Sequence, residues 1–281
     1  MVAASTPIPW ALLYVGDVPA TENGALPVPD PTSFLGLRHV IEQIPLQNTL
    51  AVSDAAIASD QPGLSVSVNV NSGIDAQFGV TVVADQQQFW TDTAAACAQL
   101  RITSRTTRAQ FMQALASTVT ADQILYFYGH AQTTGVGAAG GSDASAIMLS
   151  DERVTLGDLY LDAPTRTPLR GSPLVFLNAC ESAELSPTFY DGFVPYFMAK
   201  GARGVIGTEC RTPALFAATW ARRFFERFLT GEPVGNLMLA LRQEFLSAYG
   251  NPLGLLYAVH CDGDTQVAPA LAFVSPPRMV V

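Results

Sequence analysis

The chain has 281 residues, of which 49% are hydrophobic and only 14% charged, and its formal net charge is −9. This composition predicts a compact chain with a buried core and excludes a disordered acidic or basic protein. The acidic excess argues against direct binding of nucleic acid, because phosphate contacts require a surplus of Lys and Arg. No apolar run approaches the length of a membrane span, and the N-terminus lacks a basic signal-peptide region, so we expect a cytoplasmic protein without membrane contact.

The first part of the chain, residues 1–60, is rich in proline and predicts an irregular portion packed on the core. Residues 61–281 are expected to form the main domain. Residues 64–70 alternate apolar and polar side chains, which predicts a strand with one buried face. Residues 78–84 read as a second strand, in a hairpin with the first.

From about Thr91 onward, short apolar strands alternate with helices. The expected strands are residues 124–128, 174–177, 204–207 and 255–259, and the expected helices are residues 107–116, 192–199, 213–229 and 237–249. The first three of these strands are continuous apolar runs, which is typical of strands buried on both faces of a parallel sheet. The predicted fold is a three-layer α/β sandwich with a mostly parallel central sheet flanked by helices.

Two residues with complementary chemistry follow neighbouring strands of this sheet. His130 comes after the strand at 124–128, and Cys180 comes after the strand at 174–177. Ligands of such sheets bind at the carboxyl ends of the strands. An imidazole beside a thiol lowers the thiol pKa and can later protonate a leaving amine, so the pair predicts nucleophilic catalysis. The alternative is that each residue is an ordinary part of the core.

The residues around this pair carry a family resemblance. Gly129-His130-Ala131 and Asn178-Ala179-Cys180 resemble the caspase arrangement, in which the His lies about 50 residues before the Cys. The wider context is similar to the CHAT branch of caspase-like and separase-like peptidases. It is carried by residues 128–131, 147–159, 175–183, 201–208 and 251–254, and more loosely by residues 34–38 and 64–70.

The resemblance implies a caspase-like fold with a His130/Cys180 dyad. It also implies an oxyanion hole made by the backbone N–H groups of Cys180 and Ala131. In caspases and clostripain-like enzymes, the residue two before the Cys helps to line the pocket for the substrate side chain that precedes the scissile bond. Here that residue is Asn178, a neutral amide, so no basic preference is expected from this position.

The expected function is a cysteine endopeptidase that cleaves a protein or peptide substrate. The resemblance further implies a regulated effector, switched on by a sensor or activator, in bacterial defence or signalling. Two alternatives remain open: a catalytically silent CHAT-like binding or scaffold module, and another thiol-dependent acyl transfer on the same dyad.

The other cysteines and the glycine-rich segment receive simpler interpretations. Cys97, Cys210 and Cys261 form no CxxC pair and no zinc spacing with histidine, so we expect free thiols, no metal and no cofactor. His260 and Cys261 are adjacent in a strand and point to opposite faces, which argues against a second dyad. Residues 135–140 fit GxGxxG, but they lack the strand-to-helix turn that dinucleotide binding requires.

Beyond the strand at 204–207, a carboxylate is expected at the rim of the site. Glu209 could contact substrate or form an ion pair with Arg203 or Arg211. Cys210 could border the same cleft.

Overall fold

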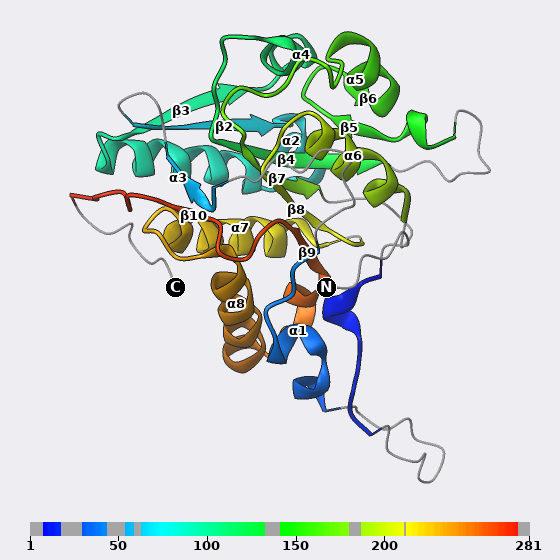
Figure 1. The fold of residues 1–281 in the computed structure, drawn as a ribbon, viewed down its shortest axis with the longest axis vertical. Helices are drawn as coiled ribbons and strands as arrows, with labels where there is room; N and C mark the ends of the chain where they lie inside the picture. Colours follow the sequence, from blue (N-terminus) through cyan, green and yellow to red (C-terminus); the bar gives the residue numbers. More distant parts are fainter. Residues whose placement is uncertain are drawn as a thin grey trace.

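A computed structural model describes residues 8–17, 30–43, 54–58, 63–132, 141–179, 187–210 and 212–274. A mostly parallel sheet forms the centre of the molecule (Figure 1). Its strands, in sheet order, are β3 (Leu100–Arg105), β2 (Leu64–Val70), β4 (Ile124–Gln132), β7 (Leu174–Ala179), β8 (Gly204–Thr208) and β9 (Tyr257–His260). Neighbouring strands are parallel except β8 and β9. A short antiparallel extension, β5 (Ala146–Met148) and β6 (Arg153–Thr155), continues from the end of β4.

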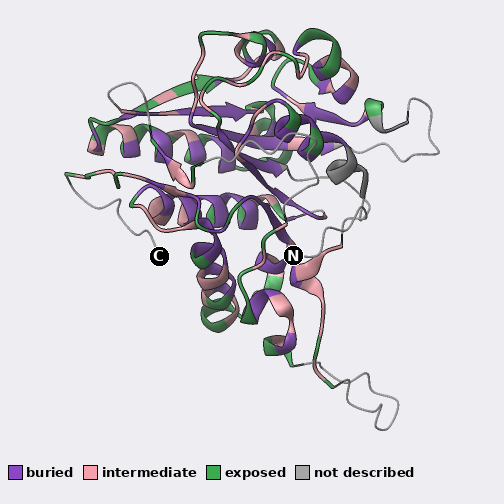
Figure 2. Cartoon of the chain, in the orientation of Figure 1, coloured by how far each residue is buried: buried purple, intermediate pink, exposed green. Residues whose placement is uncertain are grey.

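Helices cover both faces of the sheet. One face carries α2 (Gly73–Phe78), α3 (Val82–Ala96) and α7 (Ala214–Phe228), with α8 (Val234–Tyr249) packed against α7. The other face carries α4 (Arg108–Ala116), α5 (Leu156–Asp162) and α6 (Pro187–Ala199). Figure 2 shows buried residues along the strands and exposed ones on the outer sides of the helices. The expected caspase-like three-layer sandwich is confirmed. Among the described residues, no helix has both the length and the hydropathy needed to cross a bilayer.

The alternation of side chains along the central strands explains why both faces need a helical cover. On β4, Tyr126 and Tyr128 pack toward α3 and α7, whereas Leu125 and Phe127 pack toward α4, α5 and α6. Phe176 on β7 joins the first group and is fully buried. Burying one such side chain contributes about 2–3 kcal/mol, so neither helical layer can be lost without a large cost in stability.

The strand expected at residues 78–84 is wrong. This segment contains the end of α2, a turn at Gly79 and the start of α3. The Asp75 carboxylate accepts hydrogen bonds from the N–H groups of Val83 (3.0 Å) and Ala84 (2.9 Å), which satisfies two of the free donors at the start of α3. The β-branched valines suggested a strand, but the buried residues recur at helical spacing: Val82, Val83, Gln86, Phe89, Trp90 and Thr93.

The other expected elements differ mainly at their ends. The helix expected at 192–199 begins earlier, at Pro187, and that at 237–249 begins at Val234. The strand expected at 255–259 starts only at Tyr257, because the residues before it form a 3-10 helix, η4 (Pro252–Leu256).

The described N-terminal residues pack on the far end of the α7–α8 layer. They form η1 (Trp10–Leu12), η2 (Pro31–Ser33) and α1 (Leu35–Arg38), and Ala11, Leu37 and Leu255 make a small apolar cluster. The buried guanidinium of Arg242 in α8 contacts the Gly36 carbonyl (3.5 Å) and the Tyr257 carbonyl (2.6 Å). Further along, β1 (Ala56–Ile57) pairs with β10 (Gln266–Val267). The domain boundary at residue 60 stays a prediction.

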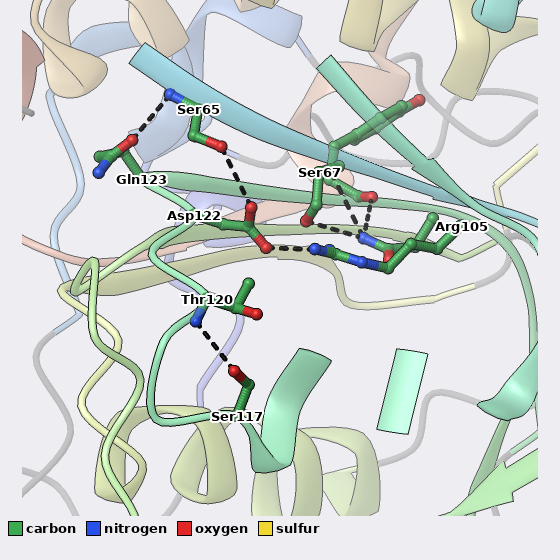
Figure 3. A network of polar contacts seen from close by, with 9 residues as sticks. Ser65, Ser67, Arg105, Ser117, Thr120, Asp122 and Gln123 are labelled. Carbon is green, nitrogen blue, oxygen red and sulfur yellow. Dashed lines mark hydrogen bonds and ion pairs between the residues drawn. The ribbon is translucent and has the colours of Figure 1, made fainter. Parts of the chain in front are cut away.

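A polar network joins the start of β2, the last residue of β3 and the segment just before β4 (Figure 3). The Asp122 carboxylate accepts from the Arg105 guanidinium (2.9 Å) and from the Ser65 hydroxyl (3.3 Å). The Gln123 side chain accepts from the Ser65 N–H (2.7 Å). These contacts tie the start of β2 to the segment just before β4, so they set the register between the two strands.

Candidate functional site

His130 lies near the carboxyl end of β4, in the position that the sequence predicted. In the parallel ladder between β4 and β7, Tyr128 pairs with Asn178 and Gly129 pairs with Ala179. His130 is the next residue on β4, and Cys180 is the next residue of the chain after Ala179. Cys180 itself lies outside the described residues. The ladder therefore places Ala179, the residue before Cys180, beside Gly129, the residue before His130.

Glycine at position 129 is required by the close approach of β5. A Cβ atom there would lie 3.0 Å from the Met148 carbonyl oxygen and 2.9 Å from the Phe127 ring. Without that side chain, β5 can pair antiparallel to β4, with His130 opposite Met148 and Ala131 opposite Ile147. The Gly-His pair is thus explained by local packing, and the antiparallel extension holds the backbone on both sides of His130.

The imidazole of His130 is half-buried against an aromatic ring. The Phe78 ring lies edge-on to it, with 5.5 Å between ring centroids and an interplanar angle of 67°. Residues two apart on a strand share a face, so His130 belongs to the same side as Tyr128, whose hydroxyl donates to the Ala214 carbonyl of α7 (3.0 Å). Phe78 and Met148 were missed as site residues. The misassigned strand at 78–84 concealed the first, and only the strand pairing identifies the second.

Asn178 is a fully buried core residue in this structure. Its Nδ2 donates to the Ala217 carbonyl of α7 (2.8 Å), and its Oδ1 accepts from the Tyr257 hydroxyl (2.6 Å). The expectation that its amide lines a substrate pocket is therefore not supported by the described arrangement. A substrate could reach the amide only if α7 and Tyr257 moved away, because they already occupy both ends of it.

Glu209 follows β8 at the same carboxyl edge of the sheet, but it is buried. Its N–H donates to the Leu256 carbonyl (2.8 Å), and its side chain accepts a hydrogen bond from the Gln43 side chain. Burial raises the pKa of the carboxyl to about 7, although the positive charge of Arg242 partly opposes this shift. Glu209 Oε2 has no hydrogen-bond partner among the described residues.

Of the two arginines expected as partners of Glu209, only Arg203 is described, and it is engaged elsewhere. The Arg203 guanidinium donates to the carbonyls of Ser172 (2.8 Å) and Asp54 (2.7 Å). Arg211 lies outside the described residues.

The rival pair, His260 and Cys261, lies at the opposite edge of the sheet. His260 pairs with Val205 at the start of β8, whereas His130 lies near the end of β4. Burial raises the pKa of the Cys261 thiol to about 12 and lowers the pKa of His260 to about 4. A thiol with such a pKa holds almost no thiolate near neutral pH, so this pair is unsuited to nucleophilic catalysis.

The remaining sites expected from sequence are less informative. Cys97, Cys210 and Cys261, the three cysteines within the described ranges, are free, and burial followed by the Glu209 charge raises the pKa of Cys210. Ala131 is buried and lies in the β4–β5 ladder. The glycine-rich segment 135–140 falls outside the described residues.

Comparison with known sequences decides the family. The family model described as "CHAT domain" matches residues 4–254. The chain belongs to the CHAT domain family. The prediction of CHAT membership is confirmed, and the match includes most of the proline-rich N-terminal portion and the central sheet as far as β8.

One relative of this CHAT chain is a protein of Vitiosangium sp. (strain GDMCC 1.1324) that is named a probable protease. It is 28% identical over 303 aligned residues, which cover 98% of this chain. The chain spans only 36% of that relative's length.

Proposed function

We propose that this CHAT domain is a caspase-like cysteine endopeptidase with Cys180 as nucleophile and His130 as general base. The observation that carries the proposal is the pairing of Gly129 with Ala179, the two residues directly before the proposed dyad. Support also comes from the relative named a probable protease.

In the proposed reaction, His130 accepts the Cys180 proton, and the thiolate attacks the carbonyl carbon of the scissile peptide. The backbone N–H groups of Cys180 and Ala131 hold the resulting oxyanion. His130 then gives its proton to the leaving nitrogen, which breaks the peptide bond and leaves an acyl-thioester. Water, deprotonated by His130, hydrolyses the thioester and restores the Cys180 thiol. The cycle needs no metal or cofactor.

The substrate is proposed to be a protein, and the enzyme a regulated effector in bacterial defence or signalling that depends on a sensor or activator. Of the two candidate specificity residues, Glu209 is better suited than Asn178 to contact substrate. The amide of Asn178 is already used by α7 and Tyr257, whereas Glu209 Oε2 has no hydrogen-bond partner within the described ranges. That oxygen is buried, so a substrate cation could supply the partner only where the residues that cover Glu209 move aside.

The test is a proteome-wide cleavage assay with wild type, Cys180→Ala, His130→Ala and the double variant. Each single variant should abolish cleavage, and the double variant should be no worse than either, because the two residues act as a unit. Cys97→Ala is the matched control, since it removes a thiol that follows α3, before the amino-terminal end of β3 and away from the dyad.

Full cleavage by Cys180→Ala would rule out the proposal. Unchanged partner binding with no turnover by wild type would favour a scaffold module. A stable acyl product without hydrolysis would favour acyl transfer on the same dyad.

A further inference from the structure

We infer that the residue directly after the scissile bond of the substrate is apolar and packs on Phe78 and Met148 beside His130. This inference rests on the proposed function and extends it to the leaving-group side of the cleavage site.

The chemistry of the leaving group fixes where this residue must lie. To protonate the leaving nitrogen, His130 must hold it about 3 Å from an imidazole nitrogen. The Cα atom of the first residue after the bond is attached to that nitrogen at about 1.5 Å. Its side chain therefore begins within about 6 Å of the imidazole. The Phe78 ring lies within the same range, with its centroid 5.5 Å from that of His130.

Within the described part of the chain, the side chains that the ring contact and the strand pairing place beside His130 are apolar. Phe78 is 49% exposed although it is aromatic, and Val80, two residues further along the chain, is 39% exposed. Met148 is half-buried and lies directly opposite His130 in the β4–β5 ladder. Directly opposed residues of an antiparallel pair share a face, with Cβ atoms about 5 Å apart. Phe78 and Met148 therefore both border the imidazole.

The polarity of a substrate side chain beside Phe78 and Met148 decides whether it favours or opposes binding. An apolar side chain removes its own surface and that of Phe78 from water, which favours binding. A charged or strongly polar one loses water without gaining a hydrogen bond from a phenyl ring or a thioether. The expected preference is thus for residues such as Leu, Met or Phe over Ser, Asp or Lys.

The backbone that carries Phe78 is held by hydrogen bonds of its own, without a ligand. Helix α2, which ends at Phe78, begins where the Asn71 side chain accepts from the Gly73 N–H (2.9 Å). It ends at Gly79, whose φ of 65° allows the chain to turn. Asp75 within the helix also caps α3. Because this backbone is already formed, a substrate need order only the Phe78 side chain, which limits the contact energy that is lost on binding.

The experiment compares two fluorogenic peptides that span a cleavage site mapped with the wild type and differ only after the scissile bond, Leu in one and Ser in the other. The readout is the ratio of their kcat/KM values within each variant, so an inactive fraction of enzyme cancels. Wild type should favour Leu by about tenfold. Phe78→Ala and Met148→Ala should bring the ratio towards one, whereas Phe78→Leu should largely keep it. Val119→Ala is the control, because Val119 is exposed (79%) in the loop between α4 and β4, before the amino-terminal end of β4.

An unchanged ratio in active Phe78→Ala and Met148→Ala enzymes would overturn the inference and leave the proposed peptidase intact. A wild-type preference for Ser would do the same. A wild type that cleaves no protein at all, even with its activator, would overturn the proposed function and this inference with it.

Discussion

The Tyr257 hydroxyl donates a hydrogen bond of 2.6 Å to Oδ1 of Asn178, and this bond joins the two strands that flank β8. Asn178 Nδ2 donates in turn to the Ala217 carbonyl of α7. Asn178, Ala217 and Tyr257 are all buried, and Asn178 lies two residues before the proposed nucleophile, Cys180. The network therefore fixes α7 against the sheet directly below the end of β7.

Tyr257→Phe should lower the free energy of unfolding by about 1–3 kcal/mol, because it leaves a buried acceptor on Asn178 unpaired. Asn178→Asp should cost at least as much, since a carboxylate cannot donate to the Ala217 carbonyl and would repel it. Urea unfolding of both variants measures these costs, and a double-mutant cycle should reveal coupling between the two positions. Thr219→Ala, on the exposed side of α7, is the control.

A different result would restore the pocket-lining role of Asn178. If Asn178→Asp were as stable as wild type and shifted cleavage towards Arg or Lys before the scissile bond, the amide would have to face substrate in the active conformation.

Thiol reactivity should single out Cys180. At pH near 6, a limiting dose of iodoacetamide should label Cys180 before Cys97, Cys210 and Cys261, because a thiol beside an imidazole holds more thiolate. Burial raises the pKa of Cys210 and Cys261, which keeps both protonated at this pH. Peptide mapping by mass spectrometry, with and without the activator, measures the order of labelling. His130→Ala should slow the labelling of Cys180 alone, and faster labelling of Cys261 than of Cys180 would contradict the proposed dyad.

Glu209 should make stability depend on pH. Its folded-state pKa of about 7 lies above the ordinary value of 4.5, so the folded protein holds a proton that the unfolded chain releases. The stabilisation that comes from this raised pKa of Glu209 is complete below pH 4.5 and is lost as the pH rises through about 7. Glu209→Gln cannot ionise, so its advantage in free energy of unfolding over wild type should grow across this window to about 3 kcal/mol.

Urea unfolding of both proteins from pH 4.5 to 8 measures this difference. His260, with its pKa lowered to about 4, gives the opposite slope between about pH 4 and 6.5, but it is present in both proteins and cancels. A difference that does not change with pH would show that Glu209 ionises normally and is not enclosed by Gln43 and Arg242.

The ion pair between Arg105 and Asp122 should contribute to stability but not to chemistry. Both side chains are about nine-tenths buried (9% and 10% exposed), so Asp122→Asn leaves the Arg105 charge without its counter-charge and should cost about 3–5 kcal/mol. The double variant Arg105→Met/Asp122→Leu should recover much of this loss. Thermal unfolding measures the stability, and kcat/KM per folded molecule should equal that of wild type. A changed kcat/KM would mean that this ion pair is coupled to the site.

The sequence by itself determined the layered architecture and the position of His130. Continuous apolar runs at β4, β7 and β8 require helical cover on both faces of the sheet. Each run can be recognised from the sequence of the strand itself. It also placed His130 at a strand end, because the apolar run of β4 stops just before it. The strand expected at 78–84 is wrong because local composition does not decide between helix and strand in this segment. β-branched residues fit either element, and the capping contacts of Asp75 with the start of α3 depend on side-chain geometry.

Only the tertiary structure decided what each polar residue near the site does. Alternation along β7 places Asn178 on the face that α7 covers, and the strand pattern cannot show that a helix carbonyl and a tyrosine hydroxyl already occupy its amide. Glu209 looked like a surface carboxylate, yet its neighbours Gln43 and Arg242 come from distant parts of the chain, and burial by such segments sets its pKa. Phe78 and Met148 reach His130 from two further elements. Long-range packing brings them together, and packing of this kind leaves no periodic signal in the sequence.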